Sequence, residues 1–339
     1  MIIAEATRAA QEVGPSPIDR LHTLVEADMA ATDRLVHERM GSTVELIPDL
    51  TRHLVDSGGK RLRPLLTLAA ASICGHGRGL HIGLAAAVEF IHTATLLHDD
   101  VVDASSLRRG KLAANIVWGN KPSILVGDFL LSRAFQLMVE TGDLRVLNIL
   151  ASASAVIAEG EVLQLRSANN LATTEADYLI IVGAKTAALF AASAEAGATI
   201  ADADPARIAA FKSYGHKLGV AFQLVDDALD YSGRQAQMGK SVGDDFREAK
   251  VTLPVILAYN RGDDDAKRFW QRTIQLGQQR DGDLQHAIWY IEQTGAIADA
   301  RDQARRYARQ ACRAIQALPP TPLRDTLIAV AEFCVQRGY

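Results

Sequence analysis

Apolar residues recur every three or four positions along most of the chain, which gathers them on one face of an α-helix. The first stripe, within residues 16–40, consists of Ile18, Leu21, Leu24, Val25, Met29 and Leu35. The same periodicity predicts further helices over residues 44–57, 64–75, 80–104, 122–141, 143–167, 174–198, 205–231, 251–260, 265–279, 283–293, 296–317 and 322–337. No segment alternates convincingly between apolar and polar residues, as a β-strand would.

Four of these runs are apolar on more than one face, as central helices of a large bundle would be. They are residues 80–104, 143–167, 174–198 and 205–231. No linker rich in serine and glycine separates them. We therefore predict one all-α domain over residues 1–339, although length alone would suggest about two domains.

Composition and charge narrow the functional classes. Of the 339 residues, 48% are hydrophobic and 10 are proline, which excludes a disordered chain. The net charge of −4 argues against a nucleic-acid binder. The three cysteines are widely spaced, so we expect neither disulfides nor a zinc site. Residues 1–13 do not resemble a signal peptide, and no uncharged apolar run of 18 or more residues predicts a membrane span.

Three carboxylates close the apolar run that ends near residue 103. Asp99 and Asp103 are four residues apart and share a helix face, whereas Asp100 lies about 100° around the axis. Like charges this close repel one another, and Mg²⁺ would relieve the repulsion because it prefers hard oxygen ligands and phosphate oxygens. Taken alone, the triad could equally be a solvated acidic helix end.

The same D-D-x-x-D spacing returns at Asp226, Asp227 and Asp230, again at the end of an apolar helix. Two identical triads more than 120 residues apart favour a functional interpretation. Facing each other, they would form a cleft for several Mg²⁺ ions. Such a cleft has too few protein ligands to surround the ions, so a polyphosphate would complete their coordination.

Basic residues stand next to turns and next to the first acidic triad. Residues 58–64 read G-G-K-R-L-R-P, and Arg108 and Arg109 follow Asp103 closely. Glycine lets the backbone approach an anion, and arginine binds phosphate oxygens in a bidentate manner. Two diphosphates are therefore expected, one bridged by metal to the aspartates and the other bound by lysine and arginine.

Together these motifs resemble those of the trans-isoprenyl diphosphate synthases, the polyprenyl synthetase family. The resemblance covers about residues 50–260 and includes L-L-H-D-D-V-V-D at 96–103, R-R-G at 108–110, K-T at 185–186, F-Q-L-V-D-D-A-L-D-Y at 222–231 and G-K-S-V-G-D-D-F-R-E-A-K at 239–250. Residues 91–103 and 158–164 resemble the long-chain branch of proteobacteria. The resemblance implies a large helical bundle around a central apolar cavity, a cytoplasmic homodimer and Mg²⁺ as cofactor. Its substrates would be isopentenyl diphosphate and an allylic diphosphate.

The resemblance also implies a role for each matching residue. The six aspartates bind Mg²⁺ and the allylic diphosphate. The residues expected to contact that same diphosphate are Arg108, Lys185, Lys240 and Lys250. Those expected to bind isopentenyl diphosphate are Gly59, Lys60, Arg63, His92 and Arg109. Thr186 and Gln223 would face the reacting carbons.

Single residues among these keep simpler explanations. His92 could be an ordinary interior histidine, and Lys185 a snorkelling lysine. Ala249 departs from the family pattern, where we expect glycine. Asp244 and Asp245 match a further acidic pair on the segment over residues 232–252, which lacks a helical pattern and is expected to close over the substrate.

The length of the product depends on a tunnel that begins at Asp99. Thr95 lies one helical turn before Asp99, and the family adds Ala94, where short-chain enzymes often carry an aromatic residue. Because both are small, we expect an open tunnel and a long product, with about eight isoprene units as first choice and nine or ten next. Phe135 and Met138 are candidates for its floor, although ordinary core packing would explain them equally well.

Other functions remain open from the sequence. A shorter-chain synthase would favour an aromatic residue at position 94 or 95. A terpene cyclase would usually lack the second triad and the G-G-K-R-x-R-P motif, and a non-catalytic subunit would tend to lose the acidic triads. A di-iron bundle needs Glu-x-x-His pairs, which the acidic motifs do not contain.

Overall fold

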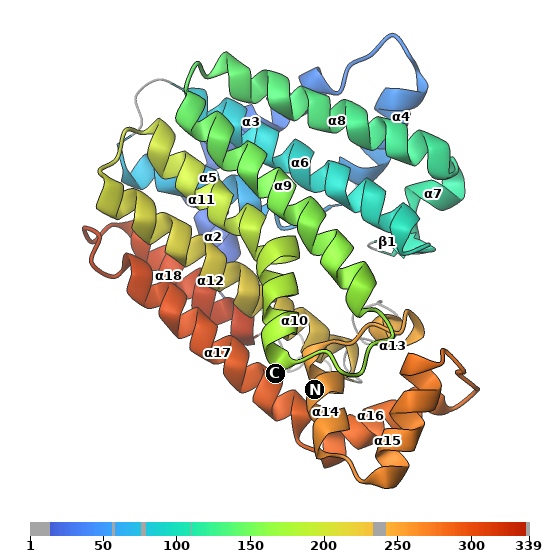
Figure 1. The fold of residues 1–339 in the computed structure, drawn as a ribbon. Helices are drawn as coiled ribbons and strands as arrows, with labels where there is room; N and C mark the ends of the chain where they lie inside the picture. The colour runs from blue at the N-terminus through green and yellow to red at the C-terminus, as the bar shows by residue number, and fades with distance from the viewer. Residues whose placement is uncertain (1–13, 56–57, 76–78, 109, 233–241, 337–339) are drawn as a thin grey trace, which may run out of the picture.

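The computed structural model describes residues 14–55, 58–75, 79–108, 110–232 and 242–336. These residues form an almost entirely helical fold, which confirms the predicted all-α class (Figure 1). The first helices are α2 (Pro17–Leu24), α3 (Glu26–Arg39), α4 (Leu46–Val55), α5 (Leu62–Ile73), α6 (Leu80–Val102), α7 (Ala114–Val117), α8 (Asn120–Glu140), α9 (Leu144–Ser167) and α10 (Glu175–Val182). They are followed by α11 (Ala188–Ile200), α12 (Pro205–Asp230), α13 (Asp244–Arg247), α14 (Leu253–Arg261), α15 (Asp264–Trp270), α16 (Asp283–Gln293), α17 (Ala296–Ile315) and α18 (Pro322–Gln336).

Local sequence explains where several helices begin. Ser16 and Thr174 each form a capping box with the aspartate three residues later. The side chain of Asp204 accepts a hydrogen bond from the backbone N–H of Arg207 at 3.0 Å, and Pro205 begins α12. These caps satisfy backbone donors that the first helical turn leaves without partners. The predicted starts at Thr174 and Asp204 are therefore confirmed.

The structure departs from the predicted helices in several ways, including the short helices α7 and α13, which lie outside the predicted ranges. The run over residues 16–40 divides at Val25 into α2 and α3. Two π-helical turns, η1 (Gly183–Ala187) and η3 (Gln271–Gln275), interrupt or end longer helices. A hairpin of two-residue strands, β1 (Leu107–Arg108) and β2 (Lys111–Leu112), was not expected. Two residues are too few to produce the alternation that identifies a strand in a sequence.

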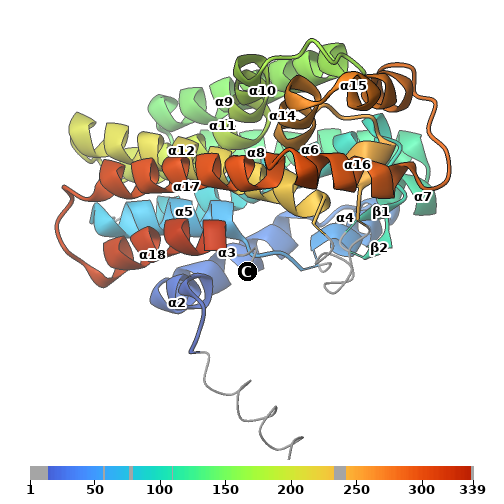
Figure 2. The ribbon, with the colours of Figure 1, turned by 90° about the horizontal axis from the view of Figure 1, so that it is seen from below.

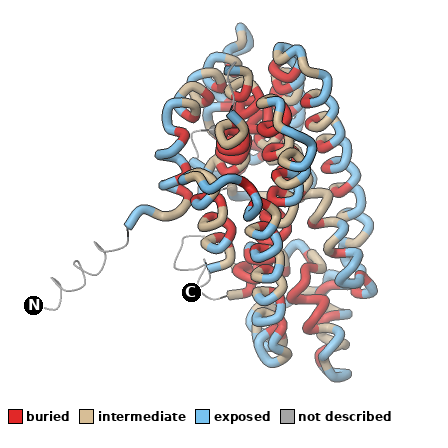
Figure 3. Tube along the Cα trace, turned by 90° about the vertical axis from the view of Figure 1, so that its left-hand side faces the viewer, coloured by how far each residue is buried: buried red, intermediate tan, exposed pale blue. Residues whose placement is uncertain are grey.

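The core is continuous through α11 and α12. In α11, Leu189 and Ala192 pack with α6, α8 and α9, whereas Phe190 and Ala194 pack with α2, α5 and α18. The second half of α12 packs with α10, α14 and α17. Figure 2 shows α12 and α17 side by side, and Figure 3 shows buried residues concentrated along the central helices. One domain over residues 1–339 stays a prediction that this continuity supports.

Four helical segments are apolar and long enough to cross a membrane, judged by length and composition alone. They are Leu80–Val102, Asn120–Glu140, Leu144–Ser167 and Glu175–Ile200. In Leu80–Val102, 67% of the most apolar window is buried inside the fold, so the core accounts for much of its apolar character. The absence of a membrane span stays a prediction.

Candidate active site

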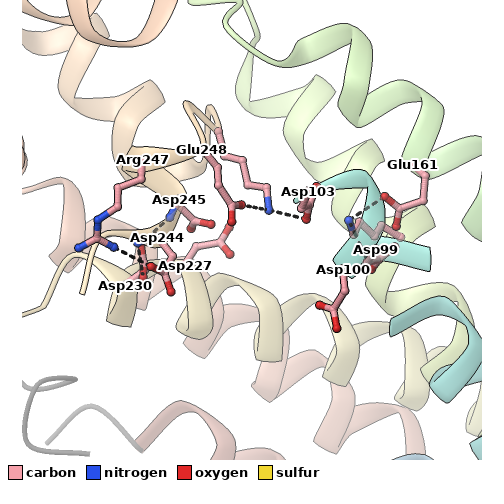
Figure 4. A network of polar contacts seen from close by, with 12 residues as sticks. Asp99, Asp100, Asp103, Glu161, Asp227, Asp230, Asp244, Asp245, Arg247 and Glu248 are labelled. Carbon is pink, nitrogen blue, oxygen red and sulfur yellow. Dashed lines mark hydrogen bonds and ion pairs between the residues drawn. The ribbon is translucent and has the colours of Figure 1, made fainter. Parts of the chain in front are cut away.

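The two acidic triads lie at the C-terminal ends of α6 and α12. Figure 4 shows carboxylates from these two ends, and from the α13 segment, approaching one another. Lys250, which follows α13, reaches the first triad, because its Nζ lies 2.9 Å from Asp103 Oδ2, and α13 itself is hydrogen-bonded to Asp230 of the second triad. The structure thus brings the two predicted motifs to one site.

The three aspartates of the first triad have different surroundings. Asp99 Oδ2 lies 3.7 Å from Lys185 Nζ, and Asp103 contacts Lys250. Asp100 is fully buried and instead accepts a 2.8 Å hydrogen bond from Arg108 Nε. Its Oδ2 atom has no hydrogen-bond partner among the described residues. Asp99 and Asp103 therefore adjoin the two lysines that are predicted to bind phosphate, while Asp100 orients Arg108.

The unexpected hairpin explains how Arg108 reaches Asp100. The chain leaves α6 at Asp103, reverses direction and returns as β1, which carries Arg108. Asn115 Nδ2 stabilises this change of direction by donating hydrogen bonds to the carbonyl oxygens of Asp100 at 3.0 Å and Ser105 at 3.1 Å. The hairpin thus positions Arg108, which is predicted to bind the diphosphate.

The second triad is held by hydrogen bonds from neutral donors. Asp227 accepts from Tyr178 Oη at 2.5 Å and from Gln223 Nε2 at 2.6 Å. Asp230 accepts from the backbone N–H groups of Asp244 and Asp245 at 3.3 and 3.0 Å. The α13 segment is therefore tied directly to the end of α12.

Burial disfavours the ionised form of these carboxylates and so raises their pKa values. It raises the pKa of Asp227 to about 7 and that of Asp230 to about 6, chiefly by removing them from water. Burial also raises the pKa of Asp99 and Asp100 and holds that of Asp245 well above its usual range. Such a concentration of destabilised negative charge is what bound cations would relieve.

The donor set fits a hard divalent cation shared with a ligand. Carboxylate oxygens are the ligands that Mg²⁺ prefers. Asp100 Oδ2, which is buried without a hydrogen-bond partner among the described residues, adds one more such oxygen. Among the described residues, no three His, Cys, Asp or Glu side chains are grouped closely enough to hold a metal by themselves. Asp99, Asp100, Asp103, Asp226, Asp227 and Asp230 would therefore hold cations together with oxygens from a diphosphate.

We predict that metal affinity falls as the pH falls. Asp227 and Asp230 must lose their protons to bind a cation, and their raised pKa values mean that protons compete below about pH 7 and 6. The Mg²⁺ concentration for half-maximal binding should rise roughly tenfold per pH unit for each proton displaced. Calorimetry with Mg²⁺ and pyrophosphate between pH 5.5 and 8 tests this, with Asp227→Asn as control because one titrating group is then removed. A flat profile, corrected for pyrophosphate ionisation, would contradict the prediction.

Lys185 and Thr186 reach the site from the π-helical turn η1. Lys185 Nζ donates to Glu161 Oε2 at 2.7 Å, and Thr186 Oγ1 donates to Gln223 Oε1 at 2.8 Å. π-helical turns are rare and often mark functional sites. The paired Lys185 is thus better explained as a site residue than as a snorkelling lysine.

Gly160 allows α9 to approach this π-helical turn closely. A Cβ atom at Gly160 would lie 2.8 Å from both Ala184 Cβ and Lys185 N. We predict that Gly160→Ala lowers kcat about 100-fold, because displacing catalytic groups by about 1 Å costs that much. The overpacking penalty of about 1–3 kcal/mol also equals or exceeds the gain of about 1 kcal/mol from removing a helical glycine.

Gly83 offers a matched control for this substitution. It lies within α6, and a Cβ atom there would meet nothing within 4 Å. Gly83→Ala should therefore raise the melting temperature and leave kcat unchanged. Wild-type kcat in Gly160→Ala, measured beside this control, would show that η1 tolerates displacement.

The predicted isopentenyl diphosphate site lies at the start of α5. Arg63 Nη1 lies 3.2 Å from His92 Nε2, and the Arg63 guanidinium stacks 4.4 Å over the Phe190 ring. Arg61, in a left-handed conformation with φ of 47°, forms an ion pair with the buried Glu89. Arg63 and His92 are therefore brought together, and Arg61 fixes the turn that carries Gly59 and Lys60.

A cavity of about 340 Å³ opens beside the acidic residues, between α9, α10, α12 and the α13 segment. Its wall combines charged and apolar side chains: Val102, Asp103, Glu161, Gln164, Leu165, Ser167, Ala168, Tyr178, Ile181, Val182, Lys185, Thr186, Gln223, Asp227, Asp245, Glu248, Lys250, Val251 and Thr252. Because five of these side chains are acidic and two are lysines, the cavity suits an apolar tail whose anionic head binds together with cations.

None of the four predicted chain-length residues belongs to this wall. Ala94 and Met138 are buried in the apolar core shared by α6 and α8, and Thr95 Oγ1 donates to the carbonyl oxygen of His92. Phe135 is 39% exposed, so within one chain it does not close an interior tunnel. All four assignments stay predictions. The assignments of Arg109 and Lys240 lie outside the described residues.

Sequence reasoning missed two residues that complete the site, Glu161 and Tyr178. Glu161 pairs with Lys185, and Tyr178 donates to Asp227. The segment over residues 158–164, already noted for its resemblance, gave a signal for Glu161. Tyr178 gave none, because a tyrosine in an apolar helix is usually a packing residue.

Comparison with known proteins agrees with this geometry. The family described as polyprenyl synthetase matches residues 44–291. Octaprenyl diphosphate synthase of Escherichia coli K12 is 42% identical over 320 residues, covering 94% of this chain and 99% of that protein.

Solved structures agree as well. A polyprenyl synthase from Caulobacter crescentus CB15, complexed with calcium and isoprenyl diphosphate, is 52% identical with a TM-score of 0.92 and covers 94% of this chain and 98% of its own. A decaprenyl diphosphate synthase from Rhodobacter capsulatus is also 52% identical, with a TM-score of 0.91 and coverage of 94% and 99%. The chain therefore belongs to the polyprenyl synthetase family and is a prenyltransferase.

Proposed function

We propose that this prenyltransferase is a long-chain trans-polyprenyl diphosphate synthase. It joins isopentenyl diphosphate repeatedly to an allylic diphosphate such as farnesyl diphosphate, by 1′-4 condensation. The observation that carries the proposal is the pair of acidic triads on α6 and α12, which meet beside a cavity of mixed polar and apolar lining. Intact triads also argue against a non-catalytic subunit.

The first task of the site is to release a diphosphate from the allylic substrate. Enzymes of this family depend on metal ions, and we propose Mg²⁺, which would neutralise charge that develops on the leaving diphosphate. Lys185, Lys250 and Arg108 contribute positive charge at the same place. Each pairs with a carboxylate: Lys185 with Glu161, Lys250 with Asp103, and Arg108 with Asp100. These pairs hold the cations where the diphosphate would receive them.

The second task is to hold isopentenyl diphosphate and to protect the carbocation. Lys60, Arg63 and His92 bind the second diphosphate without metal, as the Arg63–His92 contact supports. The oxygens of Thr186 and Gln223 stabilise the developing positive charge, and the apolar wall excludes water. The released pyrophosphate accepts the proton. The product is again allylic, so the cycle repeats.

We expect a product of about eight to ten isoprene units. The octaprenyl synthase relative supports eight, and the decaprenyl synthase structure supports ten. Octaprenyl diphosphate, for a ubiquinone side chain made in the cytoplasm, remains our first choice.

We also propose a homodimer, because α8 and α9 expose many large apolar side chains. They are Ile124, Leu125, Phe135, Val139, Leu144, Val156, Val162, Leu163 and Leu165. Exposed apolar surface typically marks a protein interface when its residues lie together. Light scattering should give about twice the chain mass of 36.6 kDa, and a monomer at micromolar concentration would refute the proposal.

Product analysis tests the proposed activity. The protein is incubated with Mg²⁺, farnesyl diphosphate and radiolabelled isopentenyl diphosphate, and the dephosphorylated products are separated by length. Products of eight to ten units support the proposal, and the dominant length selects among them. A product that stops at geranylgeranyl length would retain the chemistry but refute the long-chain assignment. No elongation by folded protein with Mg²⁺ would favour a non-catalytic subunit.

A further inference from the structure

We propose that Tyr178 is a positioning residue for Asp227 and, through it, for Gln223 and Thr186. The proposal rests on the prenyltransferase activity proposed above and deepens it. Tyr178 touches no predicted reacting atom itself. It orients the carboxylate that would share a cation with the diphosphate, and it does so through a single phenolic hydroxyl.

The contacts form a closed ring between two elements. Tyr178 Oη donates to Asp227 Oδ2 at 2.5 Å, and Gln223 Nε2 donates to Asp227 Oδ1 at 2.6 Å. Gln223 Oε1 in turn accepts from Thr186 Oγ1 at 2.8 Å. Tyr178 and Thr186 belong to the continuous helix α10–η1, and the other two residues belong to α12. Each atom of the Gln223 amide is therefore assigned one partner, which fixes its orientation.

The π-helical turn makes this ring possible. Tyr178 and Thr186 are eight residues apart, so in a regular α-helix they would point about 80° away from each other. A π-helical turn holds extra residues, and η1 begins between the two positions and includes Thr186. It turns Thr186 back toward the face that carries Tyr178. Both side chains then meet α12, at residues one helical turn apart.

The chemistry of the donors suits a metal-binding carboxylate. A phenol and a carboxamide orient Asp227 without cancelling its negative charge. Asp100 provides the contrast, because its partner is the cationic Arg108. Tyr178 is buried, so its hydroxyl cannot exchange this partner for bulk water. The ring therefore holds Asp227 in one direction while leaving its charge available.

The test is Tyr178→Phe, which removes one oxygen atom and preserves the ring that packs in the core. The first readout needs no turnover: it is the Mg²⁺ concentration that produces half of the rise in melting temperature at fixed inorganic pyrophosphate. We expect this concentration to increase about tenfold, as is usual when the partner of a metal ligand is lost. In the elongation assay, kcat should fall about 10- to 100-fold, with the KM for isopentenyl diphosphate unchanged.

Tyr214→Phe is the matched control. Tyr214 is also fully buried in α12, and its hydroxyl donates to the carbonyl oxygen of Leu327 at 2.7 Å, in a different cluster of the core. Its loss should change the melting temperature but leave the Mg²⁺ dependence and kcat as in the wild type. Incorporation of 4-aminophenylalanine at position 178 restores a donor and should return the Mg²⁺ response to the wild-type value.

The outcomes separate this proposal from the proposed function. A wild-type protein that binds Mg²⁺ and pyrophosphate but does not elongate refutes the function, while the binding test of Tyr178 still stands. An unchanged Mg²⁺ dependence in folded Tyr178→Phe overturns the positioning role. If that variant does not fold, a folded 4-aminophenylalanine variant with a weakened Mg²⁺ response overturns it equally.

Discussion

Asp227→Asn should lower kcat about 100- to 1,000-fold, the usual cost of removing one charge-stabilising group from an active site. The same substitution should make the metal-free protein more stable at pH 8. The introduced carboxamide would keep nearly the same shape but carry no charge, so it could neither hold a cation nor suffer the penalty of burial. A loss of activity together with a gain in stability would show that the buried carboxylate of Asp227 is needed for activity although its charge destabilises the fold.

The sign of the stability effect follows from the raised pKa of Asp227, about 7 in the folded protein and about 4 in the unfolded chain. The folded state binds this proton more tightly than the unfolded state does. The resulting stability is complete below about pH 4 and is lost as the pH rises to about 7. A carboxamide does not titrate, so the Asp227→Asn variant should match the wild type near pH 4 and exceed it above pH 7.

Asp283 is a buried aspartate whose pKa is lowered, whereas the pKa of Asp227 is raised. Arg272 donates to both oxygens of Asp283, at 2.7 and 2.8 Å, and lowers its pKa. Asp283→Asn should therefore lower the melting temperature at pH 8 and leave kcat unchanged. Thermal melts in EDTA at pH 4.5 and 8, together with the elongation assay, compare the two variants. An Asp227→Asn protein that is less stable than the wild type at pH 8 would refute the explanation that the buried charge of Asp227 destabilises the fold.

Ala94→Phe should shorten the final product made from farnesyl diphosphate to geranylgeranyl length. Ala94 lies five residues before Asp99 on α6, which is about 7.5 Å along the helix axis. A phenyl ring there would block a prenyl tail that grows along α6 from the diphosphate site. The rate of the first condensation should change little, because the ring lies below the reacting carbons.

The cavity beside the aspartates offers a second route for the tail, toward Ile181 and Leu165. Ile181→Phe therefore serves as the matched comparison. If the tail follows α6, Ala94→Phe shortens the product and Ile181→Phe does not. The reverse result would move the tunnel to the space between α9 and α10, and full-length product from both variants would refute both routes. Each variant needs a thermal melt, because Ala94 is buried and a larger side chain would overpack the core.

Much of the fold followed from local patterns, since helix periodicity and caps act over a few residues. The capping boxes and the proline after Asp204 illustrate this. The hairpin that carries Arg108 could not be predicted, because strands of two residues show no alternation and Arg108 is held by Asp100, which lies on α6. The π-helical turn η1 escaped prediction for a related reason: its extra residue is accommodated where Gly160 lets α9 approach.

The candidate site, like the fold, has features that the sequence predicts and features that depend on tertiary packing. The charged residues of the two triads could be identified from the sequence, because carboxylates repeated at one spacing repel one another and bound cations relieve that repulsion. Tertiary structure alone decided which partners those charges have: Arg108 for Asp100, Lys250 between Asp103 and Glu248, and Tyr178 for Asp227. Side-chain contacts between distant helices depend on how the helices pack, and no local pattern encodes that packing.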